Sequence, residues 1–155
     1  MINKFDVYFE KNDISQERNN IYASDVLDIF NSIDWLKEQK ECIKSEEEFG
    51  SFISIVYKDT AGLEYSFELE LFVDDNNKRQ EMPLNFSLSY LYQETEIHKI
   101  LFGLLGERSE IKNKNIFMDD QNMDFTMKCL NAFLKHNHEF LKNNMYENFS
   151  SDLKE

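Results

Sequence analysis

The clearest strand pattern in this chain lies in residues 63–73, which read Leu63-Glu64-Tyr65-Ser66-Phe67-Glu68-Leu69-Glu70-Leu71-Phe72-Val73. Every second side chain from Leu63 to Val73 is apolar, and most of the side chains between them are acidic or small. Alternation of period two over this length is typical of a strand with one face against a core and the other in solvent. The stretch therefore predicts a central strand whose second face is acidic.

Similar alternation appears on both sides of this segment. Residues 51–58 predict the preceding strand, and the turn Asp59-Thr60-Ala61-Gly62 ends in a glycine that can supply a positive φ. Pro83 opens a third run over residues 84–91, and proline is tolerated at the first residue of a strand because it removes only one ladder donor. We expect an antiparallel meander, with the charged segment 74–82 as a loop.

The rest of the chain predicts elements that flank or cover this meander. Apolar residues recur at helical spacing in three segments, and the first of these helices has Ser24 or Asp25 as its N-cap. The expected elements are a strand over 4–10 that suits a sheet edge, a loop over 11–20, helices over 24–45, 94–106 and 122–143, and a strand over 115–118.

These elements predict the α+β class, with an antiparallel meander of three to five strands and two or three helices packed on its apolar face. At 155 residues, with 41% hydrophobic and 14% aromatic composition, the chain has enough core material for one domain. We expect residues 1–155 to form that single domain, with fraying at residues 1–3 and 146–155.

The formal net charge of −13 bounds the classes of partner. Non-specific nucleic-acid binding needs Lys and Arg to neutralise phosphates, so nucleic acid is not an expected partner, and anionic membrane surfaces are disfavoured for the same reason. The apolar run 100–105 is too short to span a bilayer, and the first residues lack the apolar core of a signal peptide. Cys42 and Cys129 lie far apart and read as reduced core residues, so we expect a cytoplasmic protein.

Motifs for metals, cofactors and catalysis are weak. In a helix His136 and His138 would point to different faces, so we interpret them as solvated histidines near a helix end. Asp120, Asn122 and Asp124 match the first ligands of a calcium loop, but the glycine and glutamate that such a loop needs are missing, so they are better interpreted as N-cap candidates. With four glycines and no nucleophile motif in the chain, we expect no cofactor, no metal and no catalytic residue.

The acidic residues are unevenly distributed. Between Glu46 and Asp75 there are nine acidic residues and one basic residue, Lys58, which is a net charge of −8. Like charges close together destabilise a sheet, so this block favours a surface that receives a basic partner, although acidity that only keeps the protein soluble is the simpler alternative. The expected partner-binding residues are Glu64, Glu68, Glu70, Phe72, Asp74 and Asp75.

Three function hypotheses follow. The first is a non-enzymatic binder, a bacterial immunity or antitoxin-type inhibitor that occludes a basic toxin domain, plausibly a nuclease, and that is a monomer or a homodimer. The second is an acidic, dimeric secretion chaperone, because the expected order helix, three strands, helix, strand, helix is broadly similar to that of small export chaperones. The third is a small enzyme, which would reveal a deep polar pocket with perturbed carboxylates.

Overall fold

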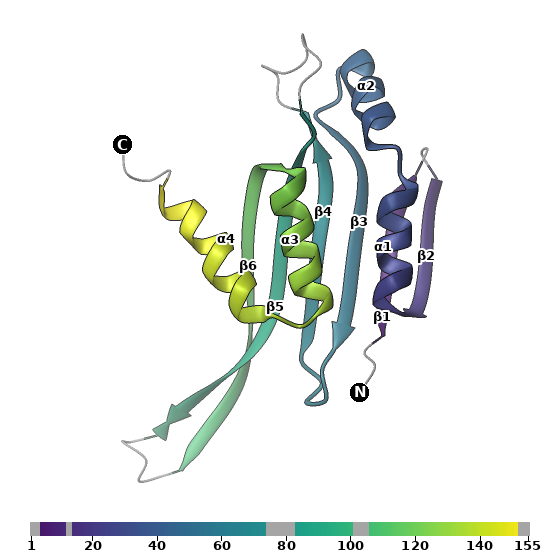
Figure 1. The fold of residues 1–155 in the computed structure, drawn as a ribbon. Helices are drawn as coiled ribbons and strands as arrows, with labels where there is room; N and C mark the ends of the chain where they lie inside the picture. Colours follow the sequence, from purple (N-terminus) through teal and green to yellow (C-terminus); the bar gives the residue numbers. More distant parts are fainter. Residues whose placement is uncertain (1–3, 12–13, 74–82, 101–105, 152–155) are drawn as a thin grey trace.

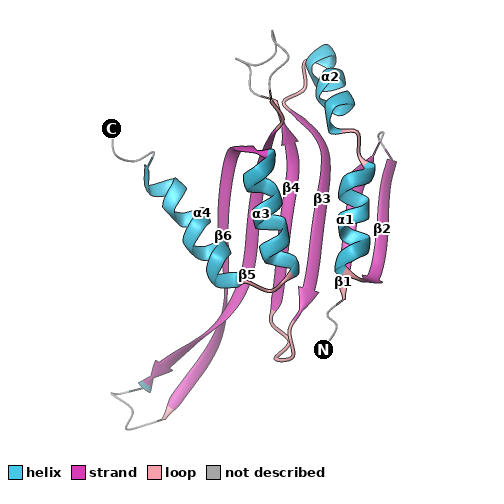
Figure 2. Ribbon diagram, in the orientation of Figure 1, coloured by secondary structure: helices cyan, strands magenta, loops and turns pink. Residues whose placement is uncertain are grey.

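A computed structural model of the chain describes residues 4–11, 14–73, 83–100 and 106–151. In this part of the chain a six-stranded antiparallel sheet is accompanied by four helices (Figures 1 and 2). The α+β class and the antiparallel meander are thus confirmed. In chain order the elements are β1 (Phe5–Lys11), β2 (Ile14–Ile21), α1 (Ala23–Ser32), α2 (Trp35–Ser45), β3 (Phe49–Lys58), β4 (Glu64–Phe72), β5 (Asn85–Lys99), β6 (Glu107–Asn122), α3 (Met123–Leu134) and α4 (His138–Ser151).

The strand order is β2-β1-β3-β4-β5-β6. Strands β3 to β6 form the expected meander, and the turn at residues 59–62 has the predicted positive φ at Gly62. The segment 14–21, expected as a loop, is the edge strand β2, so β1 lies inside the sheet and not at its edge. Seven of the eight β2 side chains are exposed, so this strand has no apolar alternation from which it could be recognised.

The core lies between one face of the sheet and the helices. Three of the alternate β4 residues that the sequence places inside, Phe67, Leu69 and Leu71, are fully buried, whereas Tyr65 is half-buried. Val26 of α1 and Leu130 and Phe133 of α3 are also fully buried. Phe133 is central, since its ring lies 5.5 Å from that of Phe67 and 5.4 Å from that of Tyr57. Burying aromatic and branched side chains against a sheet in this way is the main favourable contribution to folding.

The expected helix over 24–45 is two helices. Ile33 is extended, and the Asp34 side chain caps α2 by accepting a hydrogen bond from the Lys37 N–H at 3.1 Å. The cap residue of α1 is Tyr22, whose N–H donates to the Asp25 carboxylate at 2.9 Å. Asp25 is therefore part of a capping box and is not the N-cap itself.

The expected helix over 122–143 is also divided. Its start is confirmed, because the Asn122 side chain accepts from the Phe125 N–H. Its interruption is a Schellman turn, in which His136 has a φ of +56° and the Asn137 N–H donates to the Ala132 carbonyl. A histidine stands where glycine is usual, so the sequence hides this stop. α4 continues to Ser151, into a segment expected to fray; residues 1–3 and 152–155 lie outside the described part.

The helix expected over 94–106 is wrong for residues 94–99, which continue β5, while residues 101–105 and the loop expected at 74–82 lie outside the described residues. Residues 94–99 pair with residues 107–112 of β6. The strand expected over 115–118 therefore extends over residues 107–122. These two segments, 94–99 and 107–112, continue beyond Tyr65 and Tyr92, the last residue pair between β4 and β5. We call them the arm, and Figure 1 shows it projecting past the other strands.

Both cysteines are buried and free, as expected for reduced core residues. Burial raises the pKa of the Cys42 thiol to about 11 and that of Cys129 to about 12, so both are inert at neutral pH.

None of the helices in the described ranges is long and apolar enough to cross a membrane.

A close approach between α2 and the sheet gives a first prediction. A Cβ added at Gly50 would lie 2.9 Å from the Cys42 Sγ and 2.9 Å from a methyl carbon of Leu71. Both side chains are buried, so Gly50→Ala overpacks the contact and should lower the free energy of unfolding by roughly 1–3 kcal/mol in urea denaturation. Cys42→Ala removes one of the two clashing atoms, and the double variant should lose less than the sum of the single variants. Strict additivity would contradict this packing.

Candidate binding surface

The sheet has one covered face and one bare face. The described helices all lie on the side of the buried side chains, as Figure 1 shows for α1 and α3 in front of the strands. On the opposite side the central strands carry half-buried side chains, among them Ser54, Val56, Ser66 and Leu91. None of the described helices lies on this face, which we call the bare face, so in the described part of the chain it is available for contact with another molecule.

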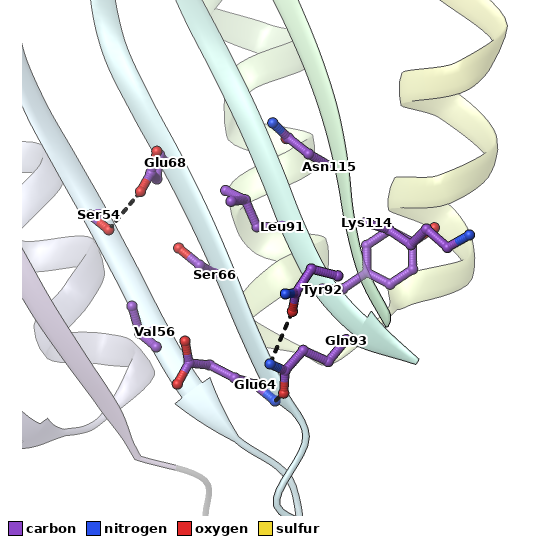
Figure 3. Close-up of a pocket in the computed structure, with 11 residues that line it drawn as sticks. Ser54, Val56, Glu64, Ser66, Glu68, Leu91, Tyr92, Gln93, Lys114 and Asn115 are labelled. Atoms are coloured by element: carbon purple, nitrogen blue, oxygen red, sulfur yellow. Dashed lines mark hydrogen bonds between the residues drawn. The ribbon is translucent and has the colours of Figure 1, made fainter. Parts of the chain in front are cut away.

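The structure places four of the six expected partner-binding residues together on the bare face, along β4. Glu64 is paired with Lys58 of β3 at 3.4 Å, so its charge is already compensated. Glu68 accepts a hydrogen bond from the Ser54 hydroxyl at 3.3 Å (Figure 3). Glu70 and Phe72 follow on the same face. Asp74 and Asp75 lie outside the described residues.

A carboxylate from β1 joins this group, and the sequence analysis missed it. The pKa of Glu70 is raised above its ordinary value because the group is partly buried and because the Glu10 and Glu68 carboxylates repel its charge. Tyr8 of β1 pairs with Ser54 of β3, and Ser54 pairs with Glu68 of β4. Only β3 therefore lies between β1 and this part of β4. We call Glu10, Glu68 and Glu70 the carboxylate cluster. The salt bridges between described side chains all use other acidic residues.

Aromatic rings lie beside the cluster. Phe52 pairs with Glu70 across β3 and β4, and its ring lies 5.8 Å from that of Tyr8, which is exposed. Phe49 and Phe72 form a second pair with ring centroids 5.7 Å apart. Carboxylates flanked by accessible rings suit cationic side chains, because a cation can ion-pair and lie over a ring face at once.

A hollow of about 400 Å³ lies beside the cluster on the bare face (Figure 3). Small side chains form part of it, and Gln93 at its rim accepts a hydrogen bond from the Glu64 N–H at 2.9 Å. Its lining includes Ser54, Val56, Glu64, Ser66, Glu68, Leu91, Gln93, Asn113, Lys114 and Asn115. These side chains offer hydroxyl, amide, carboxylate and apolar groups to a contacting molecule.

A second constellation lies on the covered side. His138, at the start of α4, contacts the Tyr57 hydroxyl through Nε2 at 2.5 Å and the Tyr90 hydroxyl through Nδ1 at 2.7 Å. The Tyr65 ring stacks on the imidazole at 4.3 Å. Burial, helped by His136 and Lys142, lowers the pKa of His138 to about 4 and raises the pKa values of both bonded tyrosines. A neutral imidazole donates from one nitrogen and accepts at the other, so His138 connects β3, which carries Tyr57, with β5, which carries Tyr90.

The expectation that these histidines are solvated and point apart is therefore wrong. It assumed an unbroken helix, whereas the Schellman turn brings both rings against Tyr57, with centroids 4.3 Å away for His136 and 6.0 Å away for His138. Within the described ranges no three His, Cys, Asp or Glu side chains are placed to hold a metal ion. The contacts of His138 make this constellation a clamp between α4 and the sheet.

Comparison with known proteins gives no relative, since no family model, curated protein or solved structure matches the chain.

Repulsion within the cluster predicts a gain in stability when one charge is removed. A raised pKa means that ionised Glu70 disfavours the folded state above that pKa and that protonation relieves the cost. Glu70→Gln should therefore increase the free energy of unfolding at pH 7 by roughly 0.2–1 kcal/mol, allowing for solvent screening, and the gain should shrink as the pH falls towards 4.5. Glu64→Gln is the matched control and should give no gain, because Glu64 is paired with Lys58. Equal effects of both variants in urea denaturation would contradict the cluster.

The histidine clamp predicts a loss of stability on mild acidification. His138 stays neutral in the folded protein down to about pH 4, whereas an unfolded histidine takes up a proton near 6.5, so stability falls as the pH drops between these values. The contribution should be about 1–2 kcal/mol after screening is considered. His138→Gln should be less stable at pH 7.5 but should lose less stability by pH 5.5. An NMR titration in which His138 protonates near pH 6.5 would refute the burial.

Proposed function

We propose that this protein is a non-enzymatic inhibitor of the immunity or antitoxin type, whose bare sheet face binds a basic protein domain and occludes it. The observation that carries the proposal is the carboxylate cluster. Glu10, Glu68 and Glu70 gather on the bare face, and none of them has a lysine, arginine or histidine partner among the described salt bridges. A cationic partner would supply the missing charge.

The energetics of the cluster support this proposal. A residue whose charge lowers stability could be replaced by a neutral residue at no cost to the fold. Such residues therefore persist where a function requires them. The side chains of the serines around the cluster are short, so a partner side chain can approach the carboxylates. The rings of Phe52 and Tyr8 add apolar area at the same place.

The proposed mechanism is occlusion. If the partner is a nuclease toxin domain, carboxylates take the positions in its cationic groove that substrate phosphates otherwise hold. Long-range attraction makes association fast and salt-sensitive, whereas desolvated contacts control release. The alternative of a secretion chaperone has less support than the sequence suggested, because residues 14–21 and 94–99 are strands and the element order on which that analogy depended is not present.

The proposal is tested by salt-dependent capture. Immobilised protein should retain one basic protein from the source cells at low salt in a stoichiometric complex, and Glu68→Lys with Glu70→Lys should abolish retention. The matched control is Glu41→Lys with Glu47→Lys, which makes the same change in net charge on and just after α2 and should retain the partner. Loss in both double variants would indicate net charge alone. Retention by the cluster variant, or an acidic partner, would contradict the proposal.

A further inference from the structure

The arm is a two-stranded ribbon whose two sides differ in chemistry. One side carries an ion-pair ladder, with the Lys112 ammonium 2.5 Å from Glu96 and the Lys114 ammonium 3.4 Å from Glu94. Lys142 of α4 reaches the same ladder, 3.7 Å from Glu94. A two-stranded ribbon alone is marginally stable in water. These ion pairs stabilise the part of the arm that adjoins the sheet.

The other side of the arm carries two exposed isoleucines, beside Thr95 and Ser109 and with Lys99 and Glu107 at its far end. Ile97 is 62% exposed and Ile111 is 59% exposed. Ile111 pairs with Thr95, two residues before Ile97, so the isoleucines are diagonal neighbours on one side of the ribbon. We call them the isoleucine pair. Adjacent exposed isoleucines on a projecting ribbon indicate a contact surface, whereas single exposed apolar residues would not.

The isoleucine pair continues the bare face. Side chains alternate along a strand, so Ile97 lies on the same side of β5 as Gln93 and Leu91, and Ile111 lies on the same side of β6 as Asn115 and Phe117. Phe117 is 46% exposed and links the two regions with a third apolar group. One surface therefore runs from the carboxylate cluster to the isoleucine pair.

We infer that the isoleucine pair is the apolar anchor of the same interface, packing on the basic partner that the carboxylate cluster attracts. This inference rests on the proposed function and adds which residues retain the partner. The five-stranded part of this surface, from Ser87 to Tyr92, is about 17 Å long and about 19 Å wide, and the two-stranded arm adds about 17 Å at a width of about 10 Å. The sum, roughly 500 Å², is more than half of the roughly 800 Å² that each partner of a stable complex contributes, which is the scale of contact with a folded domain.

Charge argues against a second copy of the chain as the occupant. Each chain has a formal charge of −13, and self-association through this surface would bring two carboxylate clusters onto one interface. Like charges facing each other across an interface cost several kcal/mol. A basic domain instead gains from the cluster and the isoleucine pair together.

Site-specific photo-crosslinking in the source cells tests the assignment. A benzophenone-bearing phenylalanine replaces Tyr8 beside the cluster, Ile111 on the arm, or Leu36 on α2 as the control, all three positions being exposed. We expect Tyr8 and Ile111 to give adducts with one and the same basic protein, Leu36 to give none, and both adducts to disappear with Glu68→Lys and Glu70→Lys.

The outcomes separate this inference from the proposed function. An adduct with a basic protein from Tyr8 alone, or different proteins from the two positions, would overturn the inference and leave the proposed function standing. A self-adduct from Ile111 would overturn the inference in favour of a second copy. If Tyr8 gave no basic protein, the proposed function would fail as well.

Kinetics on the purified adduct partner give a second measurement. Ile97→Ser with Ile111→Ser should speed dissociation about 10- to 100-fold and leave association nearly unchanged, because apolar contacts act after the encounter. Ile111→Val, which keeps the strand propensity, should speed dissociation by a smaller factor and controls for loss of fold. Unchanged dissociation in the double variant would contradict the anchor.

Discussion

The whole structure depends on apolar contact between a twisted sheet and helices that cover only one of its faces. Phe67 and Phe133 are fully buried where α3 crosses the strands, and neighbouring residues of β4 alternate strictly between that core and the other side. A sheet has two faces, and the described helices cover one of them. The side chains that point to the other face therefore contact water or a partner. The acidic side chains of β4 point to that other side, where none of the described helices covers them.

This one-sided arrangement connects stability with the proposed function. The covered face supplies the free energy of folding and is fastened further by the His138 clamp between α4 and the sheet. The bare face opposes folding at the carboxylate cluster, where partial burial and then repulsion by Glu10 and Glu68 raise the pKa of Glu70. A partner that neutralises those charges would recover this cost on binding, so the proposed interface gains affinity from strain that the free protein carries.

The sequence predicts the central strands well, because apolar and polar residues alternate strictly wherever one face of a strand is buried. It fails at β2, which is exposed on both faces, and at residues 94–99, where the spacing of a few apolar residues fits a helix as well as a ribbon. It placed Glu64, Glu68, Glu70 and Phe72 on one face, but Glu10 joins them only through pairing between strands more than forty residues apart. Long-range pairing of this kind leaves no local pattern.

The most direct test of the bare face as the binding surface is an NMR footprint. Backbone and side-chain amide signals of labelled protein would be followed while the basic partner is added. The account predicts that shifts concentrate on the bare face and the arm, at Gln93, Asn113, Asn115 and the residues around Glu68, with α1 and α3 unchanged. Shifts concentrated on α1 and α3, with the bare face unaffected, would contradict it.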